Sequence, residues 1–106
     1  MEPIGEEKES FIAVVREKLR NTAYMKAIYV GLGPIGQKIL NLPALSKAVQ
    51  ITVHRNDDDP IESYTAIAPA SMLTGVSTHQ AVWIGLESRE AADKRVWIVT
   101  SIEPLL

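Results

Sequence analysis

Few residues of this 106-residue chain have the types and spacing that catalysis or metal binding needs. The only histidines, His54 and His79, lie 25 positions apart, so a zinc site would require the fold to bring both to a carboxylate. Carboxylate oxygens suit Ca²⁺ or Mg²⁺, but three consecutive acids, 57–59, favour a solvated turn over a spaced ligand loop. The chain has no cysteine, which excludes thiolate nucleophiles and disulfides. We predict no metal site and no catalytic site.

One nucleophile arrangement can be written from the sequence, and its spacing is not specific. Ser71, Ser77 and Thr78 are hydroxyls close in sequence to His79, and Asp57 or Asp93 could supply the acid of a triad. The chain lacks the G-x-S-x-G turn that exposes a nucleophilic serine, and a triad is defined by geometry rather than by sequence. The sequence therefore favours a non-enzymatic protein.

The most distinctive motif is a glycine-rich segment, AIYVGLGPIGQKIL, over residues 27–40. Gly31, Gly33 and Gly36 have the spacing G-x-G-x-x-G, and the segment up to Gly36 resembles the dinucleotide-binding fingerprint of Rossmann-type dehydrogenases. The resemblance implies a strand before Gly31 and a helix after it, with the phosphates resting on the helix N-terminus. It also implies a ribose-binding residue at the end of the next strand. Arg55 stands there in place of the usual acid, which favours NADP over NAD.

Three features favour a structural role for these glycines. Pro43 interrupts the expected crossover helix, the ribose-binding acid is absent, and the chain has no room for a separate catalytic domain. We therefore expect the glycines to serve a turn and a close backbone contact, and we keep an NADP-type nucleotide-binding domain as the alternative.

The N-terminal half predicts mainly helix. Apolar residues at positions 11, 15 and 19, with acids before them and bases after them, predict an amphipathic helix over 6–20. The segment 24–30 is ambiguous by periodicity, and the glycines after it favour a strand. Residues 34–40 predict a helix, and Pro43 predicts that the region 36–49 forms two short helices or one kinked helix.

The C-terminal half predicts strands. Alternation over 50–54 predicts a half-buried strand, followed by a turn over 56–60 and a partner strand over 64–68 that ends at Pro69. The segments 82–86 and 96–102 are apolar on both faces and predict central strands. Between them, 88–95 has the composition of one or two helical turns, with Ser88 as the N-cap.

Composition sets the class of protein. The chain is 46% hydrophobic and 23% charged with a formal net charge of −2, which is ordinary for a globular domain and unlike a dedicated nucleic-acid binder. It has no apolar run long enough to span a membrane, and it opens with acidic residues where a targeting peptide would be basic. We expect a single soluble, cytoplasmic domain that makes no contact with membranes.

The predicted fold is α+β: an N-terminal amphipathic helix, short central helices and a mostly antiparallel sheet over about 50–102, with a small three-layer α/β fold as the alternative. Strands that are apolar on both faces need cover on both, which favours an oligomer. We expect a small binding or assembly module that contacts its own copies or other subunits, as phage head–tail connectors do. Trp83, Trp97, Leu105 and Leu106 are the predicted interface residues, although core packing is the first expectation for both tryptophans.

Overall fold

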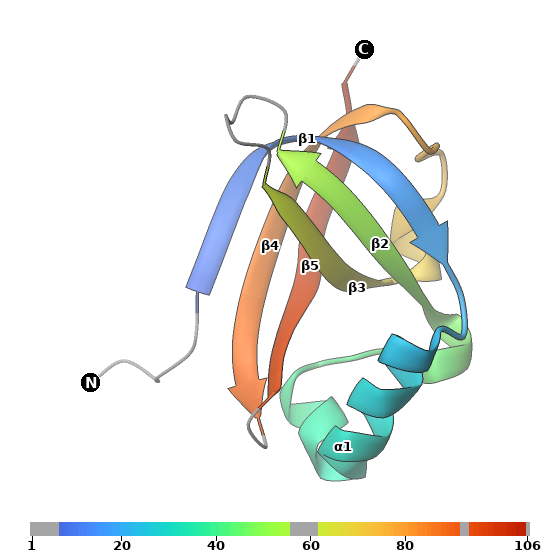
Figure 1. Ribbon diagram of the computed structural model, residues 1–106, viewed down its shortest axis with the longest axis vertical. Helices are drawn as coiled ribbons and strands as arrows, with labels where there is room; N and C mark the ends of the chain where they lie inside the picture. Colours follow the sequence, from blue (N-terminus) through green and yellow to red (C-terminus); the bar gives the residue numbers. More distant parts are fainter. Residues whose placement is uncertain (1–6, 56–61, 92–93, 106) are drawn as a thin grey trace.

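The computed structural model is a closed barrel of five strands with one helix packed against it (Figure 1). It describes residues 7–55, 62–91 and 94–105. Around the barrel the strands follow the order β1-β2-β3-β5-β4. The elements in chain order are β1 (Glu7–Leu19), α1 (Ala23–Ile39), the 3-10 turn η1 (Leu45–Lys47), β2 (Ala48–Arg55), β3 (Ser63–Pro69), the 3-10 turn η2 (Ala70–Leu73), β4 (Ala81–Ala91) and β5 (Lys94–Pro104).

The long strand β1 pairs with a different strand along each of its two halves. Its residues from Glu7 to Val14 pair antiparallel with β4, and those from Ala13 to Leu19 pair antiparallel with β2. A bulge between Val15 and Glu17 shifts the register with β2, and such bulges increase the local twist of a strand. β3 and β5 complete the barrel with a short parallel contact, in which Ala66 pairs with Trp97 and Ile67 with Ile98.

Alternate residues of all five strands fill the barrel interior. On β1 the inward residues are Phe11, Ala13 and Val15, which are buried, while Ile12 between them is exposed. The same two-residue period recurs on β2 and on the first half of β4. The buried residues of this interior cluster are Phe11, Ala13, Val15, Val49, Ile51, Val53, Ala66, Ala68, Leu73, Val76, Val82, Ile84, Leu86 and Val99.

A second apolar cluster joins α1 to the outside of the barrel. Met25, Ile28 and Tyr29 of α1 pack with strand residues whose side chains face away from the interior cluster, namely Ala48, Ile67 and Val96. Leu40, just after the helix, completes the buried set. The outward face of β5 near Val96 is thus covered by the same chain.

The helix is held at its start and broken in its middle. The Thr22 side chain accepts a hydrogen bond of 3.0 Å from the Met25 amide, which is an N-cap, and the Thr22 hydroxyl also donates to Gln50 on β2. At Gly33 the backbone takes φ 66° and ψ 175°, and Pro34 follows without an amide hydrogen. The helix is therefore kinked, and Gly33 supplies the positive φ that the kink requires.

The expected helix over 6–20 is wrong, because residues 7–19 form β1. Phe11, Val15 and Leu19 are four residues apart, and a spacing of four fits the period of two of a strand as well as the period of a helix. The β-branched residues Ile12, Val14 and Val15 favour a strand.

The expected strand over 24–30 is also wrong, because it is the first half of α1. The Thr22 cap begins a new helix there, so the helical alternative that periodicity left open is the one that forms. The predicted helix over 34–40 is confirmed as the second half of α1, which ends at Ile39. The kink lies at Gly33 and Pro34, whereas Pro43 lies in the connection between α1 and η1.

Most of the C-terminal strands are confirmed. β2 and β3 pair antiparallel as predicted, and 82–86 and 96–102 lie within β4 and β5. The turn predicted over 56–60 lies outside the described residues. The helical turns predicted over 88–95 are wrong: β4 continues to Ala91, β5 begins at Lys94, and Ser88 is a buried strand residue paired with Trp97.

The predicted α+β architecture and its three-layer α/β alternative are both wrong. The described residues form a closed barrel with a single α-helix, and no α-helix lies where the N-terminal helix was expected. The cause is non-local, because β1 is stabilised as a strand by pairing with β2 and β4, which follow it in sequence by at least about 30 residues.

Removing the N-cap tests how α1 is held. We expect Thr22→Ala to lower the free energy of unfolding by about 1 kcal/mol, since the Met25 amide loses its acceptor. Thr22→Ser is the matched control and should stay near the wild type, because it keeps the hydroxyl. Urea unfolding followed by circular dichroism measures both, and an unchanged midpoint for Thr22→Ala would contradict the capping role.

Tyr29 provides a test by pH. Burial raises the pKa of Tyr29 from 10.0 to about 12, and its hydroxyl donates to the Pro43 carbonyl at 2.9 Å. A raised pKa means that the folded state keeps a proton that the unfolded state loses, so stability is full below pH 10 and falls as the pH rises towards 12. We expect Tyr29→Phe to show a smaller loss of stability over that range, measured by urea unfolding at stepped pH. An equal loss in both proteins would contradict this assignment.

Candidate interaction surface

An apolar patch covers the outer wall of the barrel across three neighbouring strands. Ile12 of β1 pairs with Trp83 of β4, and Val14 pairs with Ala81. Directly paired residues lie on the same face of a sheet, so these four side chains share the outer surface. The Leu105 amide, just beyond β5, donates to the Ala81 carbonyl at 3.0 Å and places Leu105 next to them. We call this set the wall patch: Ile12, Val14, Ala81, Trp83 and Leu105.

The large members of the wall patch are well exposed for apolar side chains: Ile12 by 36%, Trp83 by 44% and Leu105 by 41%. Single exposed apolar residues are ordinary, whereas contiguous ones mark interaction surfaces. One acid adjoins the patch, because Glu103 of β5 is exposed and pairs with Trp83. The wall patch is thus an apolar surface with a carboxylate beside its tryptophan.

The structure separates the four predicted interface residues. Trp83 and Leu105 come together in the wall patch, so the expectation of core packing is wrong for Trp83. Trp97 is partly buried and packs against the interior cluster, as expected for a core residue, with its ring 5.4 Å from that of Tyr64 in a T-shaped arrangement. Leu106 lies outside the described residues.

A second apolar surface is carried by α1, and the sequence analysis did not find it. Val30, Ile35 and Ile39 are exposed by 82%, 78% and 66%, the highest values among the large apolar residues that the structure describes. Ile35 and Ile39 are four residues apart on the helix and lie on one face. Val30 lies before the kink, and we call Ile35 and Ile39 the helix patch. Segment 34–40 is correctly predicted as a helix, but its periodicity does not show which of its faces stays uncovered in the fold.

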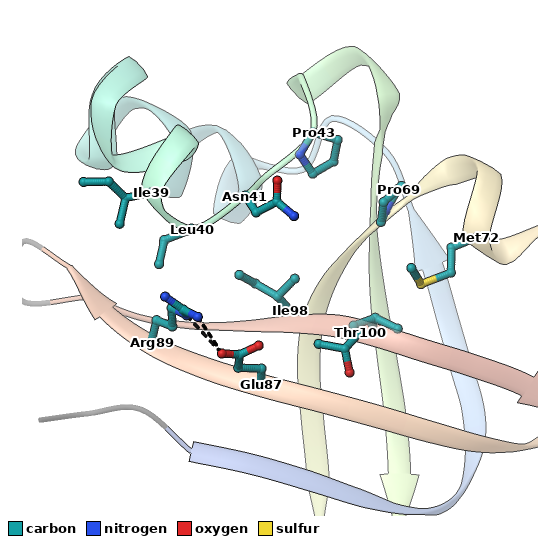
Figure 2. A pocket seen from close by; sticks show the side chains of 11 residues that line it. Ile39, Leu40, Asn41, Pro43, Pro69, Met72, Glu87, Arg89, Ile98 and Thr100 are labelled. Carbon is teal, nitrogen blue, oxygen red and sulfur yellow. Dashed lines mark hydrogen bonds and ion pairs between the residues drawn. The ribbon is translucent and has the colours of Figure 1, made fainter. Parts of the chain in front are cut away.

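A cavity of about 370 Å³ adjoins the helix patch (Figure 2). Ile39 lies at its edge, and the cavity is bounded by the end of α1, by the turn η2 and by the outer side of β4 and β5. Its apolar lining includes Leu40, Pro43 and Met72. The cavity is at the lower end of the size range of ligand pockets, so it can receive a small group or a side chain.

Polar groups stand on one side of this cavity. Arg89 donates to the Glu87 carboxylate from Nη2 at 2.7 Å and from Nε at 3.1 Å. The two residues lie two positions apart on β4 and form a fixed ion pair in the cavity wall (Figure 2). Lys38, next to Ile39, is exposed, and α1 contains two lysines and no acidic residue. The helix that presents the helix patch is therefore positively charged.

An aromatic group with charged neighbours lies at the other end of β2. The rings of Phe11 and Tyr64 are 5.0 Å apart, and the Arg55 guanidinium carbon lies 4.8 Å from the Phe11 ring centre. Arg55 also approaches the Glu9 carboxylate at 4.0 Å. Burial, followed by hydrogen bonding to Glu9 and Glu62, raises the pKa of Tyr64 well above its usual value. Arg55 and Tyr64 thus serve packing and hydrogen bonding here.

The predicted nucleotide-binding residues are not brought together. Gly31, Gly33 and Gly36 all lie within α1, which packs at the Ala48 end of β2. Arg55 is the last residue of that strand, seven positions and about 23 Å further along it (Figure 1). The strand that should precede Gly31 is helical, so the glycines form no strand-to-helix turn.

The remaining candidates for chemistry are dispersed. Among the described residues, no group of three or more histidines, cysteines or acids could hold a metal ion. His54 lies on β2, whereas His79 lies in the connection before β4, where its amide donates to the Val15 carbonyl. Asp57, Asp58, Asp59 and Asp93 lie outside the described residues. In the part of the chain that the structure describes, no helix is both long and apolar enough to cross a membrane.

Comparison of the chain with models of known protein families, with curated proteins and with solved structures gives no match in any of the three.

Thermal unfolding with nucleotides tests the placement of the glycines. We expect millimolar NADP to leave the Tm unchanged, whereas a ligand at 100 times its Kd would stabilise the fold by about 2.7 kcal/mol and raise the Tm by about 10 °C or more. Gly31→Ala should raise the Tm slightly, because alanine favours a helix by about 1 kcal/mol over glycine. An NADP-dependent shift that disappears in Gly31→Ala would contradict this placement.

Proposed function

We propose that this chain is a small non-enzymatic assembly module that contacts other protein subunits, its own copies among them, through the wall patch. The observation that carries the proposal is Trp83 on the outside of a closed barrel, with apolar neighbours from β1 and from the end of β5 around it. Tryptophan is enriched in protein interfaces and among the residues that dominate binding energy.

Packing within the chain gives the proposal further support. β4 directs Val82, Ile84 and Leu86 into the interior, so Trp83 and its outer neighbours add nothing to the core. Full burial of a large apolar side chain contributes about 1.5–3 kcal/mol, and the isolated chain leaves unused the part that belongs to the 44% of Trp83 that is exposed. A protein that binds another subunit over this wall gains that free energy.

Sedimentation velocity over micromolar to millimolar concentration tests the proposal. We expect the wild-type chain to self-associate with rising concentration and Trp83→Ser to weaken association by about 30-fold, which corresponds to about 2 kcal/mol for a central interface residue. Tyr24→Ser is the matched control, because Tyr24 is an aromatic residue of similar exposure outside both patches. It should associate like the wild type.

A wild-type chain that remains a monodisperse monomer up to millimolar concentration would contradict self-association. Equal weakening by Trp83→Ser and Tyr24→Ser would contradict the specific role of the wall patch.

A further inference from the structure

The wall patch and the helix patch lie at opposite ends of the molecule. β5 begins beside α1, where Val96 packs with Met25 and Ile28, and it ends beside the wall patch at Leu105. Nine residues of extended chain separate Val96 from Leu105, a span of up to about 30 Å. In Figure 1 α1 lies at one end of the barrel and the C-terminus at the other.

The two patches carry opposite charges beside their apolar residues. The wall patch presents Trp83 and Leu105 from the outside of the barrel, and the helix patch borders a cavity of about 370 Å³ that can receive an apolar side chain. Glu103 stands beside Trp83, and Lys38 stands beside Ile39. Both charged side chains are exposed, so a contact between the patches places an acid near a base.

We infer that the wall patch of one copy docks against the helix patch of the next, which makes the assembly contact head-to-tail. The inference rests on the proposed function and specifies its geometry. Each copy uses its wall patch on one neighbour and its helix patch on the other. A pair of copies therefore still has one free wall patch and one free helix patch, to which further copies can bind. Such heterologous contacts build a closed ring if the rotation between copies closes, and an open filament if it does not.

Mixing two defective variants tests the geometry directly. Trp83→Glu disables the wall patch and keeps the helix patch, while Ile39→Glu does the reverse. We expect each variant alone to remain monomeric at concentrations where the wild type assembles. A one-to-one mixture has one intact contact, between the wall patch of the Ile39 variant and the helix patch of the Trp83 variant. It should form a complex of two chains, twice the 11.7 kDa mass, and no larger species.

Native mass spectrometry identifies the composition of that complex, because the two variants differ in mass. The expected product contains one chain of each variant. Circular dichroism and the Tm of each variant confirm that it folds, and Trp83→Ser with Ile39→Ser replaces any charged variant that does not.

Charge reversal provides an independent measurement. We expect Lys38→Glu and Glu103→Lys each to weaken assembly several-fold, and the two together in one chain to restore it, because every head-to-tail contact then holds the reversed pair. Arg20→Glu is the matched control, since Arg20 is exposed just beyond β1, outside both patches and outside the lining of the cavity. It should have no more than a small effect.

Specific outcomes would overturn the head-to-tail contact while leaving the proposed function intact. If the Trp83 variant fails to assemble but its mixture with the Ile39 variant stays monomeric, the wall patch binds in another way, such as wall to wall across a two-fold axis. Normal assembly of the Ile39 variant would also overturn it. A wild-type chain that never assembles overturns both the contact and the self-association on which it rests.

Discussion

Closure of the barrel through β1 is the constraint on which the rest of the structure depends. The strand pairs with β4 along its first half and with β2 along its second, and the bulge after Val15 lies within the second half. Closure leaves each barrel strand with one inward and one outward set of side chains. It fixes, in one step, which residues form the interior and which form the outer wall.

The apolar residues on the outer wall of the barrel are of two kinds: those that α1 covers and those that stay exposed. Met25, Ile28 and Tyr29 of α1 cover the outer face near Val96 and Ile67, so a strand that is apolar on both faces is satisfied within one chain there. A second bulge, between Gly85 and Leu86, changes the register between β4 and β5. Beyond it, the far ends of these strands lie away from α1 and carry part of the wall patch.

The proposed function and the head-to-tail contact rest on two apolar surfaces, the wall patch and the helix patch. The kink at Gly33 and Pro34 redirects the second half of α1, whose last residue, Ile39, lies at the edge of the cavity. The glycine motif contributes to the shape of an exposed helix. Its spacing is that of a nucleotide-binding loop, but the strand-to-helix context that gives the spacing its chemistry is missing.

The sequence by itself determined the local features: the absence of cysteine chemistry, the pairing of β2 with β3, and the central segments of β4 and β5. These follow from residue type and short-range alternation. Only the tertiary structure decided that 7–19 is a strand, because four-residue spacing fits both periods until β2 and β4 pair with it. Likewise, Val82 and Ile84 are as apolar as Trp83, so only the barrel register decided that Trp83 faces outward and Trp97 packs against the core. That choice depends on pairing between distant strands and on bulges, which local sequence does not encode.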